Sequence, residues 1–116
     1  MDSLVGHHIY EIRKGIRSLS LLTMRKDLYL RSLPKLESCG VAHLAKSCGS
    51  NKMNVFFGHP SCLKLVDQLV VGDLSRLGAE TDFILGALLG YDLPEQCERY
   101  FRQKARRSLE LVAHAA

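Results

Sequence analysis

A histidine and a cysteine lie close together where a predicted strand passes into a predicted helix, in the segment Gly58-His59-Pro60-Ser61-Cys62. Free backbone amides at the start of a helix attract anions, and the same position favours the reactive thiolate of a cysteine. The segment therefore predicts an anion-binding or thiol redox site built on His59 and Cys62. The alternative, which is more common for such cysteines, is that His59 and Ser61 cap the helix and Cys62 fills the core.

Two adjacent histidines, His7 and His8, form a second polar cluster together with Tyr10. The alternation of apolar and polar residues over 7–12 predicts a strand, on which neighbouring side chains point to opposite faces. Two such imidazoles cannot bind one metal ion together, and no pair of cysteines or histidines has the spacing of a zinc motif. We therefore expect no metal site and no cofactor, and we assign His7, His8 and Tyr10 to a surface that a partner contacts.

Residues 99–107 carry five positive charges and no negative one. Three of the arginines fall on one side of a helix and form a candidate basic face: Arg99, Arg102 and Arg106. The opposite side carries an apolar stripe: Cys97, Phe101, Ala105 and Val112. The basic face suits an acidic protein or the phosphates of a nucleic acid.

Glutamates four residues away from these arginines indicate instead a lattice of ion pairs along a solvated helix. They are Glu95, Glu98 and Glu110. Aromatic residues that could stack on bases are missing from the basic side, so nucleic-acid binding is the weaker alternative.

A run of apolar residues over 83–89 contains the small-residue pattern Gly86-x-x-x-Gly90. Because the run is apolar on every face, it predicts a helix that is buried all round. Gly86 and Phe83 would then pack closely against another element, or against a second copy of the chain. Gly90 can also serve as the residue that caps this helix.

The composition is that of one ordinary folded domain over 1–116, with 47% hydrophobic residues, 24% charged residues and a net charge of +4. No apolar segment is long enough to cross a bilayer, so we expect no contact with membranes. The first residues lack the features of a signal peptide, which predicts a cytoplasmic protein. In that compartment the four cysteines are expected to be free thiols.

The pattern of periodicity predicts an α+β fold in the order β-β-α-β-β-α-α-α. We expect a small, mainly antiparallel sheet of three to four strands that is covered on one face by helices. The first two strands form a hairpin over 7–23 that turns at Lys14-Gly15, and Pro34 breaks or kinks the helix that follows. The remaining elements are strands over 41–45 and 53–57 and helices that begin near Pro60, within 78–82 and near Leu93. Gly40 is placed to cap the end of the helix over 26–39, and the carboxylate of Asp92 is placed to accept the amide of Glu95 at the start of the last helix.

Several segments are similar to a small bacterial family that is known only as a domain of unknown function, two thousand and twenty-three in that series. They include His7-His8-Ile9-Tyr10-Glu11, Asn54-Val55-Phe56-Phe57-Gly58 and Asp82-Phe83-Ile84-Leu85-Gly86. The similarity spans about residues 7–101, and the basic helical tail over 102–116 departs from it. The resemblance implies an α+β fold, a homodimer and no established activity. Members are often encoded beside a flavodoxin, which implies a redox setting by association.

These observations together favour a non-enzymatic, homodimeric protein-interaction or regulatory module. Its expected partner is an acidic protein, for which a flavodoxin is the candidate that the resemblance offers. The alternative is a thiol-based redox or anion-binding protein that uses His59 and Cys62. Nucleic-acid binding through the last helix is a weaker alternative.

Overall fold

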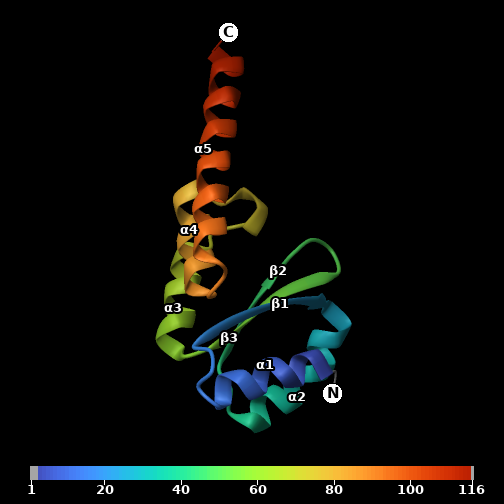
Figure 1. The fold of residues 1–116 in the computed structure, drawn as a ribbon. Coiled ribbons are helices and arrows are strands. Elements are labelled where there is room, and N and C mark those ends of the chain that lie inside the picture. Colours follow the sequence, from blue (N-terminus) through green and yellow to red (C-terminus); the bar gives the residue numbers. More distant parts are fainter. Residues whose placement is uncertain (1–2, 116) are drawn as a thin grey trace. The chain divides into compact units, whose positions relative to one another are not determined.

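The structure of the protein is a computed structural model that describes residues 3–115, with side chains over 4–113. In this range the chain forms five α-helices and a three-stranded sheet in an α+β arrangement, as predicted (Figure 1). The elements are α1 (Ser3–Arg13), β1 (Leu19–Arg25), α2 (Lys26–Cys39), β2 (His43–Ser47), β3 (Lys52–Gly58), α3 (Pro60–Leu69), the short 3₁₀ helix η1 (Leu74–Arg76), α4 (Ala79–Leu88) and α5 (Leu93–Ala115). None of these helices is long and apolar enough to cross a membrane.

The contacts within the chain divide it after Gln68 into two compact units, which we call unit 1 and unit 2. Unit 1 holds the sheet with α1, α2 and most of α3, and unit 2 holds η1, α4 and α5. That residues 1–116 form a single domain stays a prediction.

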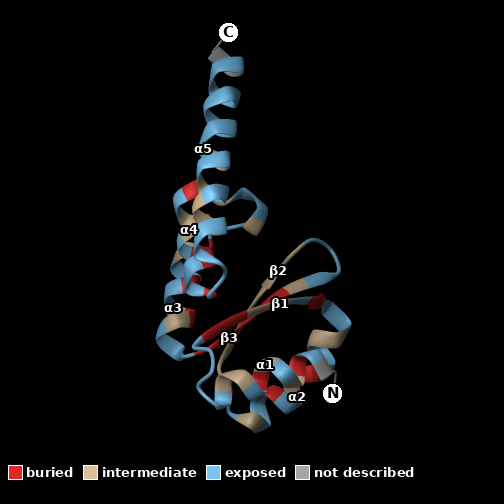
Figure 2. Cartoon of the chain, in the orientation of Figure 1, coloured by how far each residue is buried: buried red, intermediate tan, exposed pale blue. Residues whose placement is uncertain are grey.

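The sheet of unit 1 has the order β1-β3-β2, and β3 pairs with both neighbours in the antiparallel sense. Because side chains alternate along a strand, Val55 and Phe57 of β3 point to the face that α1 and α2 cover. There they pack with Val5 of α1 and Leu36 of α2 in one buried cluster (Figure 2). This cluster fixes α1 and α2 against the sheet, which confirms an antiparallel sheet with helices on one face.

The first element differs from the sequence prediction, because residues 7–12 belong to helix α1 and not to a strand. Val5 and Ile9 lie one helical turn apart and are both buried, so the helix has an apolar stripe that the alternation over 7–12 concealed. Gly15, with φ 74°, ends this helix instead of turning a hairpin. The amide of Ile16 donates to the carbonyl of Glu11 in the capping pattern that a left-handed glycine allows.

Helix α2 is continuous, although Pro34 was expected to break it. Pro34 lies on the exposed side of the helix, and the buried residues Ser32 and Leu36 flank it. The packing of Ser32 and Leu36 stabilises the helix by more than the helix loses through the hydrogen bond that Pro34 cannot donate. Gly40 caps the helix in the left-handed conformation, with φ 69°, as predicted.

Unit 2 is built on the helical hairpin of α4 and α5. The carboxylate of Asp92 accepts a hydrogen bond of 3.2 Å from the amide of Glu95, which confirms the predicted cap of α5. Helix α4 is not buried all round, because Ile84 is 42% exposed and Leu88 is also exposed. The apolar run over 83–89 therefore supplies both an internal contact and an outer apolar surface.

Candidate functional site

The basic side of α5 is tied to α4 rather than to its own helix. Arg99 donates to Asp82 from Nε at 2.8 Å and from Nη2 at 3.2 Å. Lys104 Nζ lies 3.0 Å from Glu80 Oε1, and this hydrogen bond lowers the pKa of Glu80. The predicted lattice of ion pairs along α5 is thus wrong for Arg99, because its carboxylate partner comes from α4.

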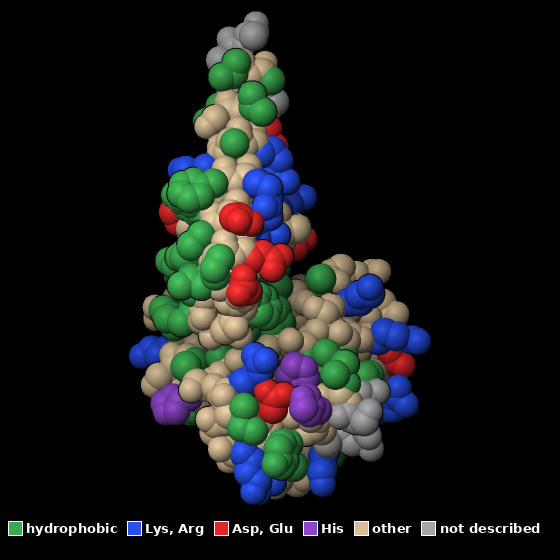
Figure 3. All heavy atoms as spheres, in the orientation of Figure 1, with side chains coloured by type: hydrophobic (Ala, Val, Ile, Leu, Met, Phe, Trp, Pro, Cys, Tyr) green, Lys and Arg blue, Asp and Glu red, His purple; other side chains and the backbone are tan. Residues whose placement is uncertain are grey.

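Two members of the predicted basic face remain available to a partner. Arg102 and Arg106 are exposed, and within the described part of the chain neither forms an ion pair. Arg99 belongs to the internal contact, and its bond to Asp82 raises the pKa of the guanidinium further. In Figure 3, Lys and Arg side chains gather on one side of the α4 and α5 region and hydrophobic side chains on the other.

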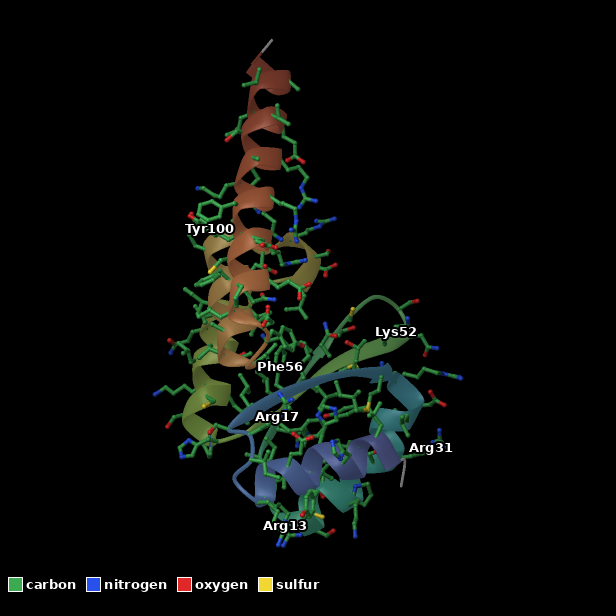
Figure 4. The ribbon with its side chains drawn as sticks, viewed as in Figure 1. Arg13, Arg17, Arg31, Lys52, Phe56 and Tyr100 are labelled. Atoms are coloured by element: carbon green, nitrogen blue, oxygen red, sulfur yellow. The ribbon has the colours of Figure 1, made fainter. Side chains whose placement is uncertain are left out.

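An apolar groove runs between α4 and α5 on the hydrophobic side. It encloses about 400 Å³ and is lined by Glu80, Phe83, Ile84, Cys97, Tyr100 and Phe101. The rings of Phe83 and Tyr100 meet edge to face with centroids 6.1 Å apart, which fixes one wall of the groove. Tyr100 is labelled in Figure 4. The groove and the apolar stripe of α5 share Cys97 and Phe101, so they form one continuous surface.

The two glycines of the predicted close-packing helix have separate structural tasks. A Cβ atom on Gly86 would lie 2.0 Å from Oε1 of Gln96, so Gly86 lets α5 approach α4. Gly90 has φ 77° and caps α4, with the amide of Tyr91 donating to the carbonyl of Gly86. Only Phe83 of this set lines the groove.

The last turns of α5 carry apolar side chains that nothing in unit 2 covers. Leu109, Leu111 and Val112 are about as exposed as Phe101, which has 68% of its surface accessible. Nearer the middle of α5, Arg107 donates a hydrogen bond of 2.9 Å to the carbonyl of Leu77. An isolated helical end of this kind gains little stability from its own hydrogen bonds in water.

The two histidines have different surroundings on helix α1, which replaces the strand geometry expected for them. His7 is paired with Glu11 one turn later, and Glu11 also binds Arg17. His8 faces the sheet, where its Nδ1 lies 3.0 Å from Oγ of the buried Ser20. Burial lowers the pKa of His8. His8 is thus half-buried against the sheet, whereas Tyr10 is exposed.

The segment over 58–62 has the expected place at the start of α3. The amide of Ser61 donates to Nδ1 of His59 at 3.1 Å, so His59 acts as a cap. Cys62 is half buried in the first turn, and Gly58 is buried at the end of β3. This arrangement matches the capping alternative for His59.

Within the described residues no three His, Cys, Asp or Glu side chains come together in a way that could hold a metal ion. The four cysteines are free thiols, and each is partly buried: Cys39, Cys48, Cys62 and Cys97.

The aromatic wall of the groove has no clear signal in the sequence. Tyr100 lies at the edge of the apolar stripe, three residues after Cys97, and Ile84 sits in a run whose lack of charge predicts burial on every face. The run lacks charge on every side, so composition alone could not tell which of its faces is outermost.

No curated protein matches the chain. A family model described as "Protein of unknown function (DUF2023)" matches residues 3–103, which includes every element from α1 through most of the α4 and α5 hairpin. The resemblance noted in the sequence is therefore confirmed, and the chain belongs to the DUF2023 family.

Proposed function

We propose that the protein is a non-enzymatic interaction module that forms a homodimer through the apolar stripe of α5 and the groove beside it. The observation that carries this proposal is Phe101, an aromatic side chain that is 68% exposed at the junction of stripe and groove. Exposed aromatic residues in a continuous apolar patch are typical of protein interfaces.

The order of side-chain sizes along the stripe supports a second copy of the chain as the occupant. Ala105 and Ser108 lie at its centre, and the larger Phe101 and Val112 lie on either side. When two copies of α5 pack antiparallel about a two-fold axis, Phe101 of one copy faces Val112 of the other. Ala105 then faces Ser108, and these small residues let the two helices approach closely.

Charge supports the same arrangement. Arg102 and Arg106 lie on the side of α5 opposite the stripe, so pairing of two stripes does not bring the arginines of the two copies together. Leu109, Leu111 and Val112, all exposed in the single chain, would gain cover near the ends of such an interface. Burial of these side chains would stabilise the last turns of α5.

The experiment is the oligomeric state of the full chain, measured by light scattering during size exclusion across protein concentration. We expect a dimer whose dissociation rises when Ala105→Glu places two carboxylates at the centre of the stripe. Phe101→Ser should act in the same direction. Arg102→Ser, on the opposite side of α5, is the matched control and should leave the dimer intact. A monomer at every concentration, or a dimer that neither stripe variant weakens, contradicts the proposal.

A second surface supports a contact with an acidic protein. Arg102 and Arg106 are exposed and form no ion pair in the described part of the chain, so their charges attract an acidic surface at little desolvation cost. On this basis we propose that the arginine pair docks an acidic partner, with a flavodoxin as the first candidate.

Titration of purified flavodoxin into the protein at low and high salt tests the second proposal. Binding should weaken with salt, and the double variant Arg102→Gln and Arg106→Gln should weaken it at low salt. Absence of binding at low salt would remove the proposal and leave the homodimer untouched.

A further inference from the structure

A second hollow lies in unit 1, where the C-terminal half of α1 meets the end of α2. It encloses about 470 Å³, and its lining includes Ile9, Tyr10, Arg13, Lys14, Lys35 and Cys39. Its size is in the range of small-molecule sites, which is about 300–1,000 Å³. Three of the lining side chains are cationic and none is a carboxylate.

The positive charge of this hollow is not neutralised inside the described part of the chain. Arg13, Lys14 and Lys35 are exposed, and none of them forms an ion pair there. Lys14 Nζ lies 5.9 Å from the centre of the Tyr10 ring, which is a weaker contact than a carboxylate would provide.

The negative ends of two helix dipoles offset only part of this positive charge. Helices α1 and α2 both end at the hollow, and each C-terminus carries about half a negative charge. Two such ends offset about one of the three positive charges. A surplus of about two charges remains, which matches a dianion better than a single carboxylate.

The hollow continues toward the start of α3. A neighbouring hollow of about 470 Å³ shares Arg13 and Cys39 with it and is also lined by Arg17 and His59. Arg17 is neutralised by Glu11, so it adds no free charge. His59 accepts the amide of Ser61 at Nδ1, which leaves its Nε2 as the proton donor of the neutral ring.

Tyr10 adds a second recognition element beside the cations. Its ring is 54% exposed, and the buried Ile9 lies one position before it in the lining of the hollow. An exposed aromatic ring next to a cluster of cations suits a ligand that has a flat or apolar part joined to an anionic group.

We propose that the hollow between α1 and α2 binds a small organic phosphate. Arg13, Lys14 and Lys35 hold the phosphate group, and the organic part lies against Tyr10 and Ile9. Arginine contributes a planar pair of donors and lysine a point charge, which together suit the oxygens of a phosphate monoester. The site lies wholly within unit 1 and does not depend on the proposed homodimer.

The test is calorimetric titration of the full chain with three probes: adenosine monophosphate, inorganic phosphate and adenosine. We expect adenosine monophosphate to bind more tightly than inorganic phosphate, and adenosine alone not to bind. Lys35→Gln and Arg13→Gln should each weaken the binding of adenosine monophosphate about ten-fold, since each removes one charged hydrogen bond.

Lys52→Gln is the matched control, because it removes the same charge from unit 1 at the end of β3 remote from Gly58 and the hollow. Figure 4 shows Arg13 and Lys52 well apart. The control should leave the affinity unchanged, and thermal unfolding should show that all three variants fold.

Three results would overturn the proposal. One is no binding of adenosine monophosphate at millimolar concentration. Another is an equal loss of affinity in Lys35→Gln and Lys52→Gln, which would mean unspecific attraction by net charge. The third is equal affinity for inorganic phosphate and adenosine monophosphate, which would mean that the organic part makes no contact.

Discussion

Arg99 of α5 donates to both carboxylate oxygens of Asp82 in α4, from Nε at 2.8 Å and from Nη2 at 3.2 Å. This pair holds α4 and α5 together in unit 2. Asp82 lies in the first turn of α4, where a negative charge is already favoured by the helix dipole. Its side chain is 16% exposed, so the pair is partly shielded from water. This contact fixes the rotation of α5 and thereby sets which of its sides is left as the apolar stripe.

Asp82→Asn should lower the free energy of unfolding by about 1 kcal/mol, because it removes the charge from a two-point hydrogen bond in a partly shielded place. Thermal or urea unfolding measures the loss. Arg102→Gln, which removes an arginine that has no carboxylate partner in the described chain, is the control and should change stability little. An equal effect of the two substitutions would mean that the pair is no more than general surface charge.

Gly58→Ala should lower stability by about 2–3 kcal/mol, since the added methyl group has no free space. A Cβ atom there would lie 2.2 Å from the carbonyl oxygen of Ser18, and that oxygen accepts the amide of His59 at 2.9 Å. The carbonyl of Ser18 is a backbone group, so it cannot rotate away from the methyl group as a side chain could. Gly49→Ala is the control, because its position is open and only the positive φ of 78° opposes the change. Urea unfolding should separate the two variants clearly.

Stability should fall as the pH drops below about 6.5, the ordinary pKa of histidine. Burial lowers the pKa of His8, with smaller contributions from the charges of His7 and Arg17 and an opposing one from Glu11. Between the lowered pKa of folded His8 and the ordinary value, the imidazole is protonated in the unfolded chain but neutral in the folded one. Acid therefore favours unfolding. The measurement is the free energy of unfolding at pH 7.5 and 5.5.

The variant His8→Asn should make that pH dependence shallower, because it removes the group that titrates differently in the two states. A slope identical to that of the unmodified protein would show that His8 is not its source.

Alkylation of Cys97 should slow as the protein concentration rises, since this thiol lines the groove that the proposed homodimer covers. Cys48, which follows β2 in unit 1, is also partly buried and serves as the internal control. Mass spectrometry of labelled peptides gives both rates in one sample. A Cys97 rate that does not depend on concentration would count against a dimer through this groove.

The sequence allowed much of the fold to be predicted wherever a local signal determines it. The alternation of side chains located β2 and β3, and Gly40 and the pair Asp92 and Glu95 marked helix ends that the structure contains. The same kind of signal failed at α1. Apolar residues there fit a period of two and a helical period equally well, and the deciding residue, Val5, lies before the alternating segment over 7–12.

The candidate sites were less predictable because they depend on contacts between distant elements. Arg99 has nearer carboxylates on its own helix, at Glu95 and Glu98, and only the packing of the hairpin selects Asp82 as its partner. The cationic hollow likewise gathers Lys35 from α2 with Arg13 and Lys14 from α1. No spacing in the sequence connects these three residues, so their juxtaposition follows from the packing of both helices on one sheet face.

The proposed homodimer would make the helical order of the last turns of α5 depend on protein concentration. Leu109 and Leu111, which are 71% and 70% exposed, bring no burial energy to a lone chain, so the amides of these turns should exchange hydrogen rapidly in dilute solution. Association would protect the same amides by mass action. Amide exchange near the end of α5 would thus report how much of the chain is assembled in the proposed homodimer.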